Sequence, residues 1–205
     1  MHQYIIDTEF AVKNLLELAN VEEKTLQNLA SRLPSVEAQF QINKWDFETS
    51  DMNDDFSDVY VMAAFRRMAK AQKETEALKV EMATIQASIG THQQAIQAIA
   101  AAILQIAKQG ISIVHGKLDA APPGRVIGTL PIRDIIWQAR NQALHFEEGV
   151  FRDSVTALFS VLETEHGTHF SLAQHAKLSR AKQIMVLLGW DRYENYLADM
   201  ATLLP

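Results

Sequence analysis

An arginine and a histidine five positions apart are the residues of this chain best suited to chemistry. Segment 140–145 reads RNQALH, so Arg140 and Asn141 precede His145. On a helix Asn141 and His145 lie one turn apart, and the long Arg140 side chain, about 140° around the axis from His145, can reach across. A guanidinium matches phosphate oxygens, and an imidazole exchanges protons near neutral pH. The segment therefore predicts one pocket that binds a phosphate and transfers a proton.

These two groups together suit cleavage of RNA without a metal ion. The ribose 2'-hydroxyl is the nucleophile in that reaction, so the protein supplies only proton transfer and stabilisation of charge on phosphorus. We expect Arg140, Asn141 and His145 to be catalytic, with no cofactor and no metal. The expected substrate-binding residues lie on the same helix: Arg133, Trp137 and Gln138. Trp137 could stack a base, although an aromatic residue at this spacing more often packs in a core.

A short helix must position the motif. Thr129 and Pro131 are typical of a helix start, Asp134 places a negative charge in the first turn, and Gly149 supplies a stop. The preceding residues 111–130 are rich in Gly and Pro and are expected to form a loop. The apolar side that can pack consists of Ile132, Ile135, Ile136, Ala139 and Ala143.

A much longer helical pattern precedes that loop. Apolar residues recur at steps of three and four from Val61 to Ile106, and their phase continues past Gly90, which favours one helix over a hairpin. We expect this helix to end at Gly110. The stripe indicates either an ordinary core face or a coiled-coil-like seam, packed against the chain's own helices or across a dimer axis.

The remaining segments complete an all-α prediction. The chain opens with a helix or helix pair ending near Arg32, followed by a connecting segment over residues 34–58. Further helices are expected at about 152–165, 172–188 and 191–203, and no segment has convincing β alternation. The predicted fold is a helical bundle with one long central helix and a short motif-bearing helix. The predicted organisation is an acidic helical extension, residues 1–54, and a helical domain, residues 55–205.

Composition favours a soluble, cytoplasmic protein without a membrane span. The chain has 205 residues, 48% of them hydrophobic and 21% charged, and contains no stretch of about 18 uninterrupted apolar residues. It has no secretion-signal pattern at its start and no cysteine. Thiolate catalysis and cysteine-ligated zinc are therefore excluded.

The net charge of −6 is unevenly distributed. Residues 1–58 carry four Lys and Arg against twelve Asp and Glu, whereas residues 59–205 carry fifteen against thirteen. Because nucleic-acid partners are usually bound by neutralising phosphates, the slightly basic second part is the one compatible with RNA. Lys117 and Arg125, in the loop before the motif helix, are further residues that could touch an RNA backbone or simply be solvated.

The motif resembles a family signature. Segment 140–145 resembles the Arg-polar-x-x-x-His signature of the HEPN superfamily, which comprises all-α domains that include many metal-independent endoribonucleases of toxin–antitoxin and antiviral defence systems. The resemblance would cover about residues 55–203 and also rests on the apolar residue before His145, the glycine soon after it and the helical setting. Some toxin members carry a tyrosine two places after the histidine, where this chain has Glu147.

The resemblance implies a role for each motif residue and an assembly. It implies that Arg140 orients the scissile phosphate, that His145 transfers protons and that Asn141 supports them, in a cleft shared by two subunits. RNA, a second copy of the chain and an antitoxin or other inhibitor are therefore the expected partners. Two alternatives remain: a non-catalytic HEPN-like module that binds protein or RNA, and an unrelated bundle in which Arg140 and His145 only cap or pair.

Overall fold

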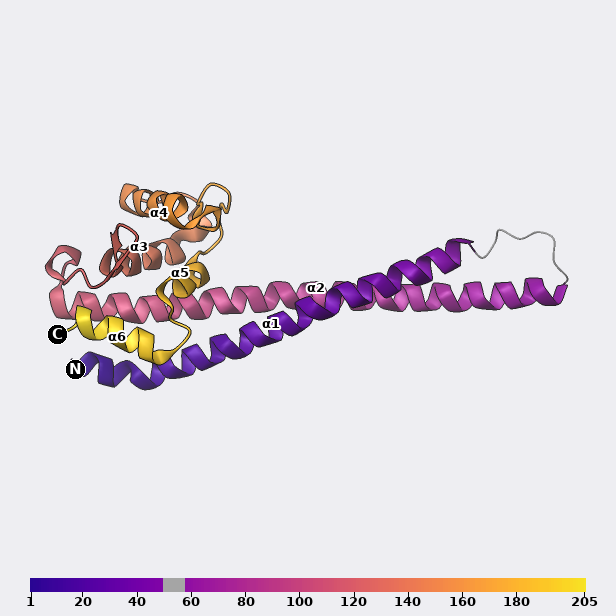
Figure 1. The fold of residues 1–205 in the computed structure, drawn as a ribbon, viewed down its shortest axis with the longest axis horizontal. Coiled ribbons are helices and arrows are strands. Elements are labelled where there is room, and N and C mark those ends of the chain that lie inside the picture. Colours follow the sequence, from indigo (N-terminus) through magenta and orange to yellow (C-terminus); the bar gives the residue numbers. More distant parts are fainter. Residues whose placement is uncertain (50–57) are drawn as a thin grey trace. The chain divides into compact units, whose positions relative to one another are not determined.

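The computed structural model describes residues 1–49 and 58–205, which are mostly helical (Figure 1). The described α-helices are α1 (Gln3–Thr49), α2 (Asp58–His115), α3 (Ile132–His145), α4 (Asp153–His166), α5 (Ala181–Leu188) and α6 (Tyr193–Leu203). Short 3-10 turns cover Leu118–Ala120, Phe146–Glu148 and Thr168–Phe170. Two-residue strands, β1 (Val126–Ile127) and β2 (Leu130–Pro131), form a small antiparallel hairpin with Val126 opposite Pro131. The predicted all-α class, with one long helix and a short motif helix, is confirmed.

The chain forms two compact units. The first comprises Met1–Glu22 and Gln94–Pro205, and the second comprises Glu23–Gln93. The first 22 residues therefore belong to the same unit as the motif helix. The expected division into residues 1–54 and 55–205 would separate them from it. The expected boundary after residue 54 itself lies outside the described residues.

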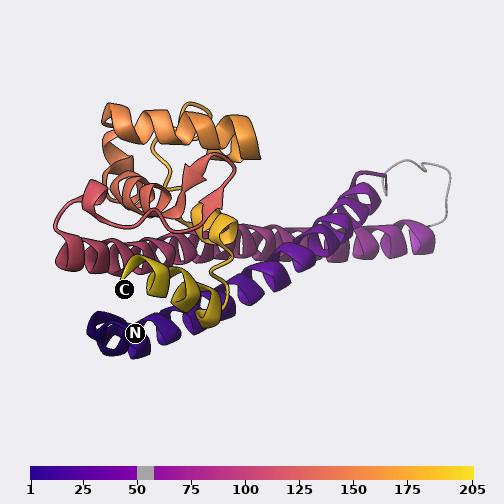
Figure 2. The same cartoon turned by 60° about the vertical axis from the view of Figure 1, so that its left-hand side comes forward.

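The core of the first unit surrounds the C-terminal part of α2. In both Figure 1 and Figure 2, α3 lies between α4 and this part of α2, while α6 and the start of α1 lie on the other side of α2. Ile103 and Leu104 of α2 and Ile135 of α3 are fully buried. Trp190 and Tyr196, next to and within α6, are also buried and meet edge to face. The motif helix α3 is therefore fixed by packing on several sides.

The expected end of the long helix at Gly110 is wrong, because α2 continues to His115. A Cβ at Gly110 would lie 2.7 Å from Cε1 of Tyr4, whose hydroxyl donates a 2.8 Å hydrogen bond to the carbonyl of Ile106. Glycine is needed here for the close approach of α1 to α2. The helix ends instead before Gly116, which adopts a left-handed φ of 73°.

The expected break near Arg32 is also wrong, because α1 runs through Pro34 without interruption to Thr49. A proline inside a helix removes one hydrogen bond to the carbonyl four residues earlier, here that of Ala30. Both Pro34 and Ala30 are exposed, so solvent can reach the carbonyl that lost its donor. The residues from 34 to 49 that were expected to connect two elements are therefore helical.

The helix expected over 172–188 is shorter than predicted, because α5 begins only at Ala181. The preceding residues are held in an irregular path by the side chain of Gln142 in α3. Its Nε2 donates to the carbonyl of Leu178 and its Oε1 accepts from the amide of Arg180, each at 2.9 Å. These bonds satisfy backbone groups that a helix would otherwise have paired.

The second unit has little buried apolar surface. Val36 of α1 and Ile85 of α2 are buried, and an ion pair joins Arg32 to Glu81. By contrast, Phe65 of the apolar stripe is 59% exposed, and Val80, outside the stripe, is 66% exposed. In the described part of the stripe, Ile96, Ile99 and Ile103 of the first unit are buried, whereas Leu78, Met82 and Ile89 of the second unit are only partly buried.

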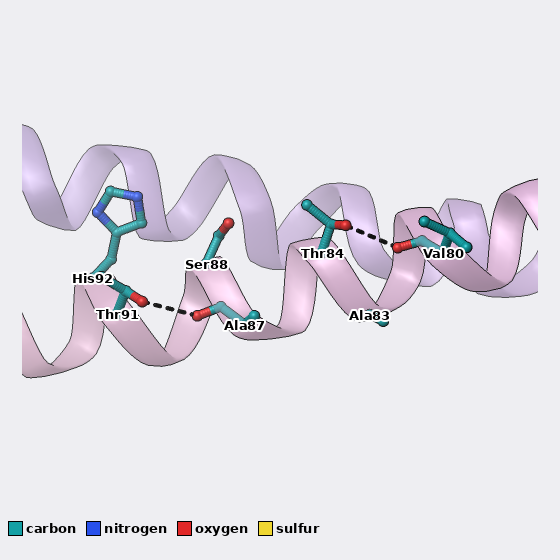
Figure 3. A pocket seen from close by; sticks show the side chains of 7 residues that line it. All are labelled: Val80, Ala83, Thr84, Ala87, Ser88, Thr91 and His92. Carbon is teal, nitrogen blue, oxygen red and sulfur yellow. Dashed lines mark hydrogen bonds between the residues drawn. The ribbon is translucent and has the colours of Figure 1, made fainter.

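An open groove of about 590 Å³ runs along α2 within the second unit. Its lining is Val80, Ala83, Thr84, Ala87, Ser88, Thr91 and His92. Figure 3 shows these side chains along a single helix, where Thr84 donates to the carbonyl of Val80 and Thr91 to that of Ala87. His92 is the one titratable group among these seven residues. The other six lining residues are apolar or carry a hydroxyl group.

Part of α2, Ala69–His115, is long and apolar enough by length and composition to cross a membrane. The core helix of a soluble protein has the same properties, and the last turns of α2 pack inside the first unit. The structure is compatible with a soluble protein.

Candidate functional site

Arg140, Asn141 and His145 line one pocket of about 310 Å³ in the first unit. They come from the last two turns of α3, and the other wall comes from the residues that follow. Gly149, in a left-handed conformation with φ of 70°, ends the 3-10 turn after α3 and lets the chain reverse into α4. The other lining residues are Glu148, Val150, Phe151, Arg152 and Val155. The structure thus brings the three expected catalytic residues to one concave surface.

Arg140 is held by neutral groups. Its Nε donates to Oε1 of Gln105 on α2, and its Nη1 donates to Oδ1 of Asn141 at 3.2 Å. Among the described residues, no carboxylate pairs with this guanidinium. Burial lowers the pKa of Arg140, which reflects a positive charge that is partly removed from water. A fixed, half-buried and uncompensated guanidinium favours binding of an external anion.

A chain of hydrogen bonds fixes Asn141. Its Nδ2 donates to Oε1 of Gln138 at 3.3 Å, and the same oxygen accepts from Oγ of Ser154 on α4 at 3.4 Å. Gln138 is buried and is not part of the pocket lining that the structure describes. The expected substrate-binding residue Gln138 therefore lies behind the pocket, where it positions Asn141 and, through Asn141, the guanidinium of Arg140.

His145 is held by a carboxylate. Its Nδ1 lies 2.7 Å from Oε1 of Glu148, and both side chains are more than half exposed. The contact fixes one ring nitrogen and leaves Nε2 available for proton transfer. Glu148 was not among the expected site residues. The sequence signal for this contact is a carboxylate three residues after a histidine at a helix end.

Trp137 lies beside Lys108, a residue that sequence reasoning did not identify. Nζ of Lys108 on α2 lies 4.2 Å from the centre of the Trp137 ring. Burial and the positive charge of Arg140 lower the pKa of Lys108. Trp137 is not among the pocket-lining residues that the structure describes. Lys108 covers one face of its ring, where a base would otherwise stack. No local sequence signal joins Lys108 to the motif, because the contact depends on how α2 packs on α3.

The contacts of Arg133 are structural. Its Nη1 donates to the carbonyl of Ala121 at 2.6 Å and its Nε to Oδ1 of Asp134 at 3.0 Å, and its side chain is only 17% exposed. It stands two turns before Arg140 on α3 and is not part of the described pocket lining. These contacts anchor the loop before α3 to the start of that helix.

Arg125 is likewise bound within the protein. Its Nε and Nη2 donate to the two carboxylate oxygens of Asp199 at 2.7 and 2.9 Å, and Nη2 also donates to the carbonyl of Leu188. The second oxygen of Asp199 also accepts from Nε1 of Trp190 at 2.8 Å. The interpretation of Arg125 as a possible RNA contact is therefore replaced by a structural one, in which the loop is tied to α6.

Gln142, in the middle of the motif, faces away from the pocket lining into the protein. It is 1% exposed and makes the two hydrogen bonds that hold residues 178 and 180. The motif thus combines pocket residues at its two ends with a structural residue between them.

Among the residues that the structure describes, no group of three or more His, Asp or Glu side chains is arranged to hold a metal ion. Comparison of the chain with protein-family models, with curated proteins and with solved structures gave no match.

Proposed function

We propose that this chain is a metal-independent endoribonuclease of the HEPN type. The observation that carries the proposal is that Arg140 and His145 line one pocket, where Glu148 holds His145 and no carboxylate of the described residues pairs with Arg140. The first group can bind a phosphodiester and the second can exchange a proton. The all-α fold and the place of the motif at the end of a short helix also support it.

The proposed reaction is transfer of the phosphate to the ribose 2'-oxygen. The 2'-oxygen attacks phosphorus and loses its proton to a base, the bond from phosphorus to the 5'-oxygen breaks, and that oxygen gains a proton. The products are a 2',3'-cyclic phosphate and a 5'-hydroxyl. Arg140 stabilises charge on the non-bridging oxygens, and Nε2 of His145 performs one of the two proton transfers.

A second copy of the chain completes the site in this proposal. One subunit supplies one motif histidine, whereas the reaction needs both a base and an acid. Val150, which lines the pocket, is 78% exposed, and Leu144, next to His145 in the sequence, is 51% exposed. An exposed apolar rim of this kind is suited to contact with another protein surface. We propose a homodimer whose two pockets face each other.

The setting we propose is the cytoplasm, in a toxin–antitoxin or phage-defence system. In such a system an antitoxin or other inhibitor would restrain the ribonuclease. The tyrosine that some family members use for control is replaced by Glu147, so a different means of inhibition is required.

Cleavage of RNA in the presence of EDTA tests the proposal. The wild type should cleave, and Arg140→Ala and His145→Ala should each lose at least about a hundredfold in rate, as expected for loss of charge stabilisation or proton transfer. Arg66→Ala and His175→Ala are matched controls outside the pocket and should cleave like the wild type. Equal cleavage by all five proteins, or none by the wild type, would overturn it.

The second candidate is a non-catalytic HEPN-like module that binds protein or RNA. The exposed apolar side chains of the second unit favour it, because Met62, Phe65 and Val80 are each more than half exposed. Wild-type protein that cleaves no RNA under any divalent-ion condition but binds RNA or another protein tightly would establish this candidate instead.

A further inference from the structure

Lys108 and Arg140 form a pair of neighbouring cations where α2 packs on α3. Gln105 and Lys108 stand about one turn apart on α2, and Trp137 and Arg140 stand about one turn apart on α3. Gln105 accepts from Arg140, and Lys108 lies over Trp137, so the two helix faces meet through both pairs. The described part of the structure pairs neither cation with a carboxylate.

Holding Lys108 and Arg140 close together costs free energy unless an anion binds between them. Two positive charges close together repel each other, and here both are partly removed from water, as the lowered pKa values of Lys108 and Arg140 reflect. Glu148 in the same pocket pairs with His145, and Asp134 on α3 pairs with Arg133. In a chain with a net charge of −6, a cation pair left without a carboxylate indicates a place for an external anion.

We propose that Lys108 binds a second phosphate of the RNA chain, next to the phosphate held by Arg140. This inference rests on the proposed function and extends the substrate site from α3 onto α2. Trp137 acts here as a platform that holds the lysine ammonium in place through its ring face. Lys108 is thus a substrate-binding residue, and no proton transfer is assigned to it.

Binding of a 2'-O-methylated oligoribonucleotide tests the inference separately from cleavage, because the blocked 2'-oxygen cannot attack phosphorus. Lys108→Gln should weaken binding several-fold at low salt. It should also reduce the slope of log affinity against log salt by about 0.7, the value for one phosphate contact on a single strand. Lys108→Arg, which keeps the charge, should retain the slope, and Lys79→Gln, which removes an exposed lysine of the second unit, should behave like the wild type. Melting temperatures of all four proteins check their folding.

The outcomes separate this inference from the proposed function. If ordinary RNA is cleaved through His145 while Lys108→Gln leaves affinity and salt slope unchanged, the second phosphate site is wrong and the ribonuclease stands. If RNA is bound with a slope that depends on Lys108 but is not cleaved, the site stands and the catalytic proposal fails. Absence of both binding and cleavage by the wild type would overturn both.

Discussion

Nδ1 of His145 lies 2.7 Å from Oε1 of Glu148, so the imidazole is held by a carboxylate three residues further along the chain. In the proposed reaction this contact orients the imidazole ring, as carboxylates do for other catalytic histidines. Glu148 is therefore a positioning residue for His145.

Glu148→Gln should slow cleavage about tenfold while leaving affinity for the 2'-O-methylated oligonucleotide nearly unchanged, because a positioned histidine contributes through proton transfer rather than binding. Single-turnover kinetics measure the first effect and a binding titration the second. Glu147→Gln, which removes the neighbouring negative charge, should behave like the wild type. Equal rates for Glu148→Gln and the wild type would remove Glu148 from the mechanism.

Replacement of Gly110 and of Gly90 by alanine should change the free energy of unfolding in opposite directions. In an open helix position alanine is favoured by up to about 1 kcal/mol, and a Cβ at Gly90 would meet nothing within 4 Å. At Gly110 the Cβ would lie 2.7 Å from the ring of Tyr4, which must then shift at a cost of about 1–3 kcal/mol. Denaturant unfolding should show stabilisation by Gly90→Ala and destabilisation by Gly110→Ala. The same sign for both would contradict the close approach of α1 to α2.

Two substitutions of Asp199 should separate the stability contributed by its hydrogen bond with Trp190 from that contributed by its ion pair with Arg125. Asp199→Ala leaves the buried indole N–H of Trp190 without its acceptor, at a cost of about 2–4 kcal/mol. Asp199→Asn keeps an acceptor for the indole and loses mainly attraction to Arg125, whose side chain is 45% exposed, at about 1 kcal/mol. Chemical denaturation measures both. Equal losses for the two variants would show that the ion pair dominates.

Glu165 should give the first unit a stability that depends on acid pH. Hydrogen bonds from the hydroxyl and amide of Thr129 lower the pKa of this carboxyl. The folded pKa is thus below the unfolded value of about 4.3, so the contribution is complete above that pH and is lost as pH falls through the lowered value. The difference in melting temperature between wild type and Glu165→Gln should shrink from pH 6 to pH 3. Glu163→Gln controls for removal of one negative charge, and a constant difference would contradict the assignment.

Local sequence signals predicted the elements whose boundaries depend on local chemistry. The motif helix begins after Pro131, and Gly149 stops the 3-10 turn that extends it, as their conformational preferences require. The errors arose where tertiary packing decided the outcome. Gly110 indicates a helix end from sequence alone, but its role is to admit the Tyr4 ring. Pro34 indicates a break, but its exposed position makes the lost hydrogen bond tolerable.

The site was predictable only along the motif helix. Arg140, Asn141 and His145 share a pocket as their spacing requires, because one helix carries all three. Gln105 and Lys108 could not be predicted, because they reach the site from a helix more than thirty positions earlier in the sequence. Helical periodicity gives the face of each helix but not the register at which two helices meet.

The buried amide of Gln142 has a practical consequence for mutagenesis of the motif. It is neighbour in sequence to Asn141, yet its loss would release the backbone at Leu178 and Arg180 rather than any group that meets a nucleotide. A substitution there should lower the proposed activity by loosening the fold around α5, and a rate assay alone would not distinguish that loss from loss of a catalytic group. The melting temperature of each inactive motif variant must therefore be measured before a catalytic role is assigned to the substituted side chain.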